Sequence, residues 1–168
     1  MVVMESSYHE ALTSAAKAPT VSSGSPEEKA GIERFKDFFA DLKEEHIRAK
    51  TRDVYAEDVY FNDTLKEIRG IDALEPYLLE SAAAVESCTV DIGDVAAHDG
   101  NYYFRWTMDI RFKSIKKGQL TRSIGISHIR FNKEGKICLH QDYWDSTSGF
   151  FQHVPFVGYL IRKIKARF

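Results

Sequence analysis

The chain has 168 residues, of which 43% are hydrophobic and 29% are charged, a composition typical of one globular domain with a substantial core. Its formal net charge of −2 excludes, for the chain as a whole, the strong basic field by which many proteins bind nucleic acid. The sequence contains no apolar run of the roughly 18–20 residues that span a bilayer and no secretory signal pattern, so we expect a cytoplasmic protein.

The N-terminal part of the chain divides into two segments of different composition. Residues 1–24 are rich in Ala, Ser and Thr, and their few large apolar groups cannot offset the entropy cost of ordering, which predicts a flexible tail. A helix is predicted to begin at "SPEE", with Ser25 as N-cap, Pro26 at the first helical position and Glu28 completing a capping box. Apolar residues at helical spacing follow, namely Ile32, Phe35, Phe38, Phe39 and Leu42.

The rest of the chain alternates helix and strand and then becomes a run of strands. We predict a short helix over residues 48–54, a short strand at "DVYFND" and a helix at "GIDALEPYLLESAAAV". Polar, glycine-containing turns then separate four long strands, at about 88–97, 102–114, 119–131 and 136–145. This order predicts the α+β class, with a curved antiparallel sheet wrapped around the N-terminal helices.

Strict alternation in the second of these long strands indicates which face of the sheet is buried. Five large apolar residues occupy every second position: Phe104, Trp106, Met108, Ile110 and Phe112. Polar and charged residues lie between and after them: Arg105, Thr107, Asp109, Arg111 and Lys113. We therefore expect the first set to face the core and the second set to face water or a partner.

Four motifs occur in an order and spacing that resemble a known superfamily. They are "YAEDVYFND", "RGIDAL", "SHIRFNKEGKI" and "DYWD", and the chain is similar over about residues 26–168 to nuclear transport factor two-like proteins. This superfamily includes SnoaL-like polyketide cyclases, ketosteroid isomerase and limonene epoxide hydrolase, and the sequence looks closest to an uncharacterised bacterial SnoaL-like group. The resemblance implies a conical α+β barrel domain over residues 25–154, an apolar pocket, and a homodimer formed through the outer face of the sheet.

The resemblance also suggests a catalytic base. It puts Asp63 at the position of the isomerase's catalytic aspartate, at the end of an apolar row on its strand. Burial of a carboxylate among apolar groups raises its pKa towards values useful for taking a proton from carbon. The alternative is that Asp63 caps the turn before "TLKE", a position that aspartate also favours. Both interpretations remain open.

The two well-understood catalytic sets of the superfamily are incomplete in this sequence. The isomerase's two acids that bind the developing enolate are matched by Phe39, which cannot donate a hydrogen bond, and by Ser127, a weak donor. Asp142 matches the aspartate that protonates the epoxide in the hydrolase. The Arg and second Asp of that enzyme have no counterpart on the inward face of the second long strand, because Arg105 and Asp109 are predicted to point outward.

The last long strand, in "GKICLHQDYWDS", contains the largest group of candidate functional side chains. The resemblance turns His140, Asp142 and Trp144 inward, with His140 and Asp142 roughly 6.6 Å apart along the strand at ~3.3 Å per residue. An inward Asp and His resemble those that handle protons in SnoaL-like cyclases, where Asp142 would tune the charge of His140. A buried His–Asp pair that is only structural is the competing interpretation.

The complete predicted site therefore has three catalytic residues, Asp63, His140 and Asp142, and a wider set of ligand-binding residues: Phe39, Phe61, Phe104, Trp106, Met108, Ser127 and Trp144. We expect it to bind a small apolar molecule that carries oxygen and to perform acid–base chemistry of the isomerase, cyclase or hydrolase kind. The alternative is a module that binds a ligand or a second copy without turnover. No cofactor is expected, and a metal held by the three catalytic residues ranks last because their spacing is no recognised metal pattern.

Two further features lie outside this site. His128 and Arg130 are predicted on the outward face, as part of a solvated or dimer surface. The C-terminal segment, residues 155–168, reads as a basic amphipathic helix with four cations: Arg162, Lys163, Lys165 and Arg167. Its opposing apolar face comprises Leu160, Ile161, Ile164 and Phe168. We expect this helix to close the open end of the cone, with contact to an anionic membrane surface through residues 157–168 as the alternative.

Overall fold

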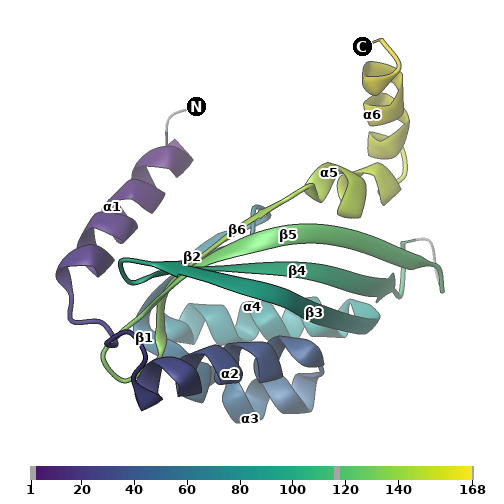
Figure 1. The fold of residues 1–168 in the computed structure, drawn as a ribbon. Coiled ribbons are helices and arrows are strands. Elements are labelled where there is room, and N and C mark those ends of the chain that lie inside the picture. Colours follow the sequence, from purple (N-terminus) through teal and green to yellow (C-terminus); the bar gives the residue numbers. More distant parts are fainter. Residues whose placement is uncertain (1–2, 116–117, 168) are drawn as a thin grey trace.

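The computed structural model describes residues 3–115 and 118–167, which form one curved six-stranded sheet with helices on both faces (Figure 1). The helices are α1 (Val3–Lys17), α2 (Pro26–Ala40), α3 (Glu44–Val54), α4 (Ile71–Ala83), α5 (Ser146–Gly149) and α6 (Val157–Lys165), with a 3₁₀ turn η1 (Phe151–His153) before α6. The strands are β1 (Tyr55–Asn62), β2 (Glu67–Arg69), β3 (Val85–His98), β4 (Asn101–Phe112), β5 (Leu120–Phe131) and β6 (Ile137–Trp144).

The sheet has the strand order β2-β1-β6-β5-β4-β3, does not close on itself, and wraps around α2, α3 and α4 (Figure 1). This confirms the predicted α+β class and the curved sheet around the N-terminal helices. The sheet is mixed rather than wholly antiparallel, because β1 and β6 run parallel. Two parallel neighbours need a long connection, and here the whole of β2, α4 and the β3–β5 meander supplies it.

The helices that fill the concave face begin and pack as the sequence indicates. Ser25 caps α2, since its hydroxyl accepts the Glu28 N–H at 3.1 Å. The Glu28 carboxylate reaches back to the Gly24 N–H and also accepts the Tyr102 hydroxyl at 2.6 Å, which fastens α2 to β4. Side chains from both layers then form one buried core, whose least exposed members include Phe35, Phe38, Leu74, Phe104 and Ile129.

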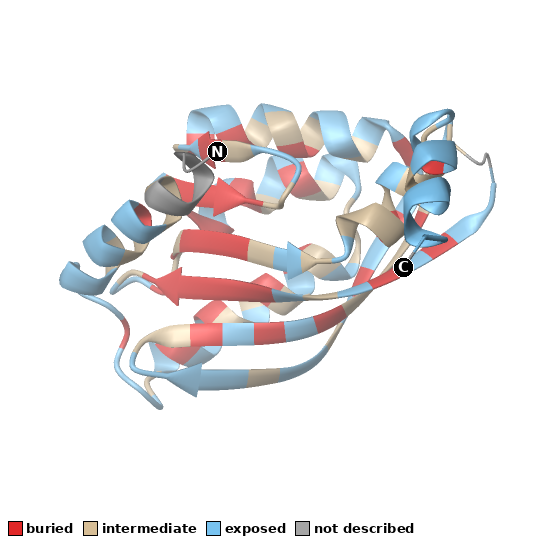
Figure 2. Ribbon diagram, turned by 90° about the horizontal axis from the view of Figure 1, so that it is seen from above, coloured by how far each residue is buried: buried red, intermediate tan, exposed pale blue. Residues whose placement is uncertain are grey.

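The alternation of β4 is confirmed, and it defines two chemically different faces of the sheet. Phe104, Trp106, Ile110 and Phe112 are buried, whereas Arg105 is exposed. Figure 2 shows this as alternating buried and exposed bands along the meander strands. The buried face points to α2 and α4, so the functional pocket must be sought there.

The segment predicted to be a flexible tail instead contains the 15-residue helix α1, which lies against the outer face of β6. Its small residues allow a close approach: Ala11 is buried, and Leu12 and Ala15 pack with it on Tyr60 and Leu139. Composition misled the prediction because alanine buries little surface by itself but lets a helix cover the large side chains of the sheet. Residues 1–2 of the predicted tail lie outside the described part of the chain.

The outer face beneath α1 is correspondingly not a solvated surface. His128 and Arg130, which the alternation of β5 placed outward, are only 1% and 5% exposed. The Tyr8 hydroxyl on α1 is hydrogen-bonded to Nδ1 of His128 at 2.9 Å, and Asn101 accepts Arg130 at 2.8 Å. The orientation was right, but a helix that the sequence analysis missed covers it.

None of the helices in the described residues is long and apolar enough to cross a membrane.

Candidate functional site

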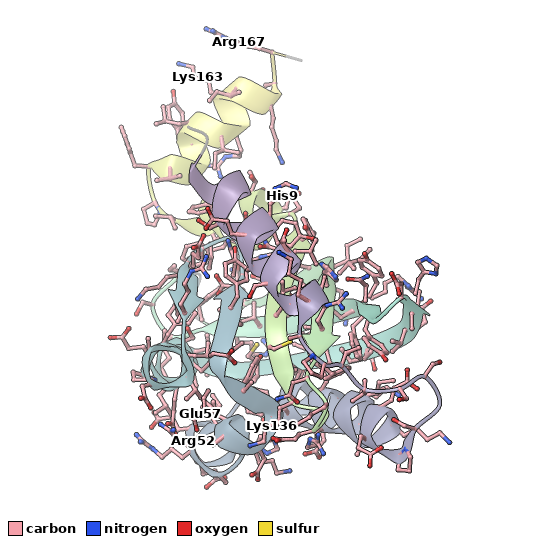
Figure 3. The ribbon with its side chains drawn as sticks, turned by 90° about the vertical axis from the view of Figure 1, so that its left-hand side faces the viewer. His9, Arg52, Glu57, Lys136, Lys163 and Arg167 are labelled. Carbon is pink, nitrogen blue, oxygen red and sulfur yellow. The ribbon has the colours of Figure 1, made fainter. Side chains whose placement is uncertain are left out.

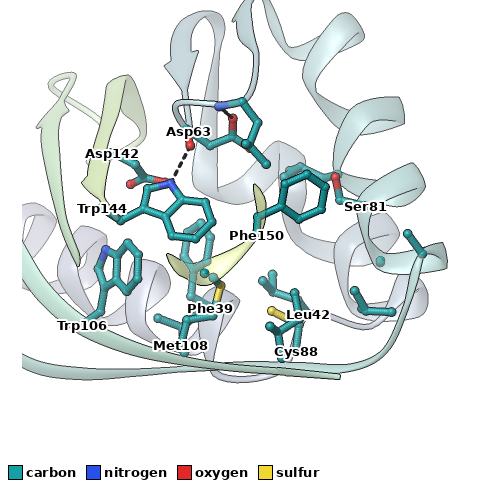
Figure 4. A pocket seen from close by; sticks show the side chains of 18 of the residues that line it. Phe39, Leu42, Asp63, Ser81, Cys88, Trp106, Met108, Asp142, Trp144 and Phe150 are labelled. Atoms are coloured by element: carbon teal, nitrogen blue, oxygen red, sulfur yellow. Dashed lines mark hydrogen bonds between the residues drawn. The ribbon is translucent and has the colours of Figure 1, made fainter. Parts of the chain in front are cut away.

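A cavity of about 320 Å³ lies between the concave face of the sheet and the helices α2 and α4 (Figure 4). Phe35 and Phe39 of α2 form one wall, strands β3 to β6 form another, and Phe150, just after α5, closes one side. Most of the wall is aliphatic or aromatic. Polar wall groups are few, and they are Asp63, Tyr77, Ser81, Ser127 and Asp142, with the Cys88 thiol. Pockets of this kind bind apolar molecules and use the few polar groups to orient them.

Asp142 is the centre of a hydrogen-bond network in this wall. The register of β5 and β6 places Ser127 directly opposite Asp142, and the Ser127 hydroxyl donates to Asp142 Oδ1 at 2.5 Å. Trp106 in turn donates its indole N–H to the Ser127 hydroxyl oxygen at 2.9 Å. The Trp106 ring can lie over β5 because the residue there is Gly125, where an added Cβ would sit 2.4 Å from the ring. A glycine is therefore required for this arrangement.

His140 lies behind Asp142 and holds the same carboxylate oxygen. Its Nε2 is 2.8 Å from Asp142 Oδ1, and its Nδ1 is 2.9 Å from the Tyr55 hydroxyl. Burial, followed by the charges of Asp142 and Asp63, raises the pKa of Tyr55 well above its ordinary value of 10.0, so Tyr55 remains a donor. Tyr55 can then donate to Nδ1, and Nε2 can donate to Asp142.

The two oxygens of the Asp142 carboxylate consequently differ. Oδ1 accepts from both Ser127 and His140, whereas Oδ2 has no hydrogen-bond partner among residues 3–115 and 118–167. Asp142 belongs to the cavity wall, where it lies beside Trp144 (Figure 4). Asp142 is thus a residue of an apolar cavity wall in which one carboxylate oxygen is held by two donors and the other has no partner in the described chain.

Asp63 has a different position at the end of β1. Its Oδ1 accepts the N–H groups of Leu65 and Lys66 at 3.0 and 2.9 Å, and its Oδ2 accepts the Tyr77 hydroxyl. Burial raises the pKa of Asp63, while these three hydrogen bonds act in the opposite direction. Asp63 therefore caps the turn, as one of the two interpretations of the sequence holds, and at the same time borders the cavity.

Most residues predicted to bind the ligand lie in the cavity wall, and two predicted site residues do not. The wall includes Phe39, Phe61, Trp106, Met108, Ser127 and Trp144. Phe104 is fully buried instead, with its ring 4.2 Å from that of Phe35, so it supports the α2 wall from behind. His140 likewise lies behind the wall, where it holds Asp142 and where Tyr55 and three phenylalanines surround its ring.

Sequence reasoning missed three residues that shape the site: Tyr55, Tyr77 and Phe150. The described part of residues 155–168, which were expected to close the cone, does not line the cavity, whereas Gly149 and Phe150 do. Trp144 packs so closely on Gly149 that an added Cβ would lie 2.4 Å from its ring. This contact seats α5 over the cavity, while α6 extends away from the body (Figure 1). Phe168 of the predicted lid lies outside the described residues.

The structure also bears on the residues predicted to point outward, Arg105 and Asp109, and on the hypothesis of a metal site. Arg105 is paired with Asp94 and Arg122 with Asp109 on the exposed side, so the hydrolase's Arg and second Asp are absent from the cavity wall in the described chain. Within residues 3–115 and 118–167, no group of three or more His, Cys, Asp or Glu side chains is arranged to hold a metal ion.

Comparison with known proteins agrees with this architecture. The profile of the SnoaL-like domain family matches residues 35–140, which contain the α2 wall, the meander and His140. The chain belongs to the SnoaL-like domain family. No curated protein matches it. The family match ends two residues before Asp142, so the functional residues of this SnoaL-like protein have to be argued from its own geometry.

Solved structures share the fold at low sequence identity. A nuclear transport factor two-like protein of unknown function from Exiguobacterium sp. 255-15 is 18% identical, with a TM-score of 0.58 over 68% of this chain and 98% of its own. An LEH-like epoxide hydrolase from M. tuberculosis is 17% identical, with a TM-score of 0.61 over 82% and 99% of the two chains. A protein with a ketosteroid isomerase-like fold from Catenulispora acidiphila is 13% identical, with a TM-score of 0.63 over 76% and 95%. These likenesses establish the fold of this SnoaL-like protein.

Proposed function

We propose that this protein binds a small apolar molecule that carries a carbonyl group and removes a proton from the carbon beside it, with Asp142 as the base. The observation that carries the proposal is the asymmetry of the Asp142 carboxylate. One oxygen is held by Ser127 and His140, and the other is uncommitted at the wall of an apolar cavity. A base must combine a fixed position with one free lone pair, and this carboxylate has both.

The surroundings of Asp142 define how the step would proceed. Oδ2 takes the proton, and the electron pair of the broken C–H bond moves into the carbonyl to form an enolate. His140 and Ser127 are positioning residues, because their hydrogen bonds to Oδ1 fix the carboxylate and stabilise its charge in an apolar surrounding. In an isomerisation, the protonated Asp142 returns the proton to another atom of the same conjugated enolate. In a ring closure, the enolate carbon first bonds to a second carbonyl carbon of the substrate, the C=O electron pair of that carbonyl moves to its oxygen, and Asp142 returns the proton to this alkoxide.

The hydrogen-bond donors of the cavity wall already have protein acceptors, and this indicates which substrates suit the site. The hydroxyl and indole donors among the described wall residues all serve protein acceptors: Tyr77 donates to Asp63, Ser81 to the Tyr77 carbonyl, Ser127 to Asp142, Trp106 to Ser127, and Trp144 to the Asp63 carbonyl. Little stabilisation is left for an enolate oxygen, whereas a dedicated oxyanion site contributes about 3–4 kcal/mol in enzymes that have one. The substrate class is therefore an already activated carbon acid, such as a β-dicarbonyl or a benzylic ketone.

The test is hydrogen–deuterium exchange at carbon. We would follow the α-protons of β-tetralone and of an aromatic β-keto ester by proton NMR in D₂O, with wild-type protein and with Asp142→Asn. We expect wild type to accelerate exchange and Asp142→Asn to slow it by about 10²–10⁴-fold, the usual contribution of a general base. Probe binding, followed by thermal shift, should change little, because the amide keeps the shape of the carboxylate.

Asp63→Asn is the matched control, since it neutralises the second carboxylate of the wall. Its oxygens are occupied by the turn and by Tyr77, so this variant should retain most of the exchange activity. Equal exchange rates in wild type and Asp142→Asn would overturn the proposal. Loss of activity in Asp63→Asn alone would transfer the role of base to Asp63.

Binding without turnover is the second candidate function, and one observation favours it. Phe39 lines the cavity at the position where the resemblance expects a hydrogen-bond donor for an enolate. A cavity without free donors can hold an apolar molecule by burial alone. This candidate predicts that the probes bind equally to wild type and Asp142→Asn and that neither protein exchanges their protons.

We also propose that a second copy of the chain covers the uncovered part of the outer sheet face. Ile124 is 70% exposed, and Ile126 and Tyr143 pair across β5 and β6 with exposures of 42% and 50%. Apolar side chains grouped in this way on a sheet face are typical of an interface. Sedimentation velocity should find a dimer for wild type and a monomer for Ile124→Glu, and a monomeric wild type would exclude this arrangement.

A further inference from the structure

The C-terminal helix α6 is attached to the body mainly through its first turn and otherwise projects from it (Figures 1 and 3). The attachment is Gly158, the only buried residue of α6, which packs on the carbonyl of Gln152 in η1. A Cβ at this position would lie 2.0 Å from that oxygen, so only glycine permits the contact. The first turn is thus fixed, and the main neighbour of α6 in the described chain is η1.

The projecting helix exposes an unusual amount of apolar surface. Phe156, immediately before α6, is 76% exposed, and within the helix Tyr159, Leu160 and Ile164 are 53%, 45% and 59% exposed. At about 100° per residue, three apolar side chains share one side of the helix, and we call them the apolar stripe: Leu160, Ile161 and Ile164. Single exposed apolar residues are ordinary, but a row along one helix indicates a surface that becomes covered.

Cations flank the apolar stripe on both edges. The same helical geometry places Arg162 and Lys165 along one edge and Lys163 along the other, and Arg167 follows in the turn after the helix. No acidic residue occurs after Gly158. Lys165 contacts the Ser148 hydroxyl at 3.4 Å, whereas Lys163 extends over the Tyr159 ring and, like Arg167, points away from the body (Figure 3).

We propose that α6 binds an anionic lipid surface, with the apolar stripe inserted between headgroups and the flanking cations bound to lipid phosphates. Charge complementarity favours this occupant, because long basic side chains at the edges of a narrow apolar face can bury their stems and extend their charges to the headgroup layer. Nucleic acid would leave the stripe exposed. An α6 of nine residues is about 13 Å long, too short to cross a bilayer of about 30 Å, so the helix lies on the surface.

The inference does not depend on the proposed chemistry of Asp142. Gly149 and Phe150 border the cavity, whereas no residue of the apolar stripe belongs to its wall. A helix of this length buries little surface, which makes the attachment weak, reversible and sensitive to salt. The partner is therefore defined by its chemistry alone: a lipid bilayer whose surface carries negative charge.

The test is flotation of the full chain with phosphatidylcholine vesicles, with and without phosphatidylglycerol, at low and high salt. Wild type should float with the anionic vesicles at low salt, and salt or removal of phosphatidylglycerol should release it. Lys163→Glu/Arg167→Glu should weaken this partition by more than about tenfold, because each basic residue near such a surface contributes on the order of 1 kcal/mol. Both side chains are exposed, so the body keeps its fold.

Two comparisons make the result decisive. Lys29→Glu/Lys133→Glu changes the net charge by the same amount on exposed residues of α2 and of the β5–β6 turn, and it should float like wild type. Leu160→Ser/Ile164→Ser keeps every cation and should lose most of the binding, since it removes the apolar stripe. No flotation of wild type at low salt, or equal flotation of wild type and Lys163→Glu/Arg167→Glu, would overturn the proposal. A change of oligomeric state in the α6 variants without vesicles would also overturn it, by assigning the stripe to a second copy.

Discussion

Two buried histidines on neighbouring strands face opposite sides of the same sheet, and they have nearly the same local geometry. His140 on β6 points to the cavity side, and His128 on β5 points to α1; each is 1% exposed. Each has its Nδ1 at 2.9 Å from a tyrosine hydroxyl, of Tyr55 and Tyr8 respectively. The difference lies at Nε2, which meets the Asp142 carboxylate in one case and the Asn101 amide oxygen in the other.

The partner at Nε2 therefore determines whether each histidine cluster contains a second ionisable group. Asp142 can carry a charge and belongs to the cavity wall, so the His140 cluster has an ionisable group at the place where a ligand would bind. Asn101 cannot ionise, and its oxygen is shared with Arg130 beneath α1, so the His128 cluster can only hold the helix to the sheet. Burial and hydrogen bonding of a histidine therefore do not by themselves indicate catalysis; the partner must be ionisable and must reach a cavity.

Among the substitutions that test this comparison, His140→Leu should have the largest effect on stability, and His128→Leu is its counterpart on the other face of the sheet. His140→Leu leaves the Tyr55 hydroxyl without its partner in the core and deprives Asp142 of one donor, which should lower the free energy of unfolding by about 3 kcal/mol. His128→Leu should cost only about 1 kcal/mol, because Arg130 still donates to Asn101 and the half-buried Tyr8 can turn to water. Urea denaturation at pH 7 measures both. Equal losses would mean that the cavity side gives His140 no special role.

The next effect is a pH dependence that belongs to His128. Burial, followed by the charges of Arg130 and His140, lowers the pKa of His128 from 6.5 to about 4. The unfolded chain therefore binds the proton first, and stability is lost as pH falls from about 6.5 towards 4. Between pH 7 and pH 5 the loss should be about 2 kcal/mol, at 1.36 kcal/mol per pKa unit.

The groups that face His128 are Tyr8, Asn101, Arg130 and the Tyr103 ring, which stacks on it at 4.8 Å, and none of them is an acid that would hold the added proton. His128→Gln should remove this part of the pH dependence in urea denaturation at the two pH values. If the variant loses as much stability on acidification as wild type, the dependence arises elsewhere in the chain.

Removing one hydroxyl from each cluster should have a smaller effect than removing the imidazole of His140. Tyr55→Phe leaves Nδ1 of His140 without a donor in the interior, and we expect a loss of about 2 kcal/mol. Tyr8→Phe deletes a hydrogen bond of the same length at the edge of α1, where water can approach, and about 1 kcal/mol should be lost. Thermal unfolding measures the difference between the two variants. A larger loss for Tyr8→Phe would contradict the ranking of the two clusters.

Much of the fold was predictable because it follows from local periodicity. The alternation of β4 correctly assigned Phe104 to the core and Arg105 to the exposed face, and glycine-containing turns located the meander. Helix α1 was not predictable in this way. This helix is stabilised by packing on Tyr60 and Leu139. Neither the small side chain of Ala11 nor the composition of the segment indicates that it packs on a strand far away in the sequence.

The site was predictable only where it lies within one strand. The two-residue spacing of His140 and Asp142 indicated a shared face, and the structure joins them at 2.8 Å. Tyr55 and Phe150 come from other elements, and their approach depends on how β1 and α5 pack, which a single sequence does not encode locally. For Asp63, both interpretations described the same position, since a turn cap at the end of β1 also borders the cavity.

The most direct test of the account is to ask which histidine senses a ligand. Long-range proton–nitrogen NMR spectra would resolve the imidazole nitrogens of the six histidines, assigned with His140→Leu and His128→Leu, before and after saturation with β-tetralone. We expect the His140 nitrogens to shift, because the ligand meets the carboxylate to which Nε2 is hydrogen-bonded, and the His128 nitrogens to stay unchanged. Ligand binding that leaves His140 unchanged, or that shifts His128 as much, would contradict the assignment of the functional site to the Asp142 side of the sheet.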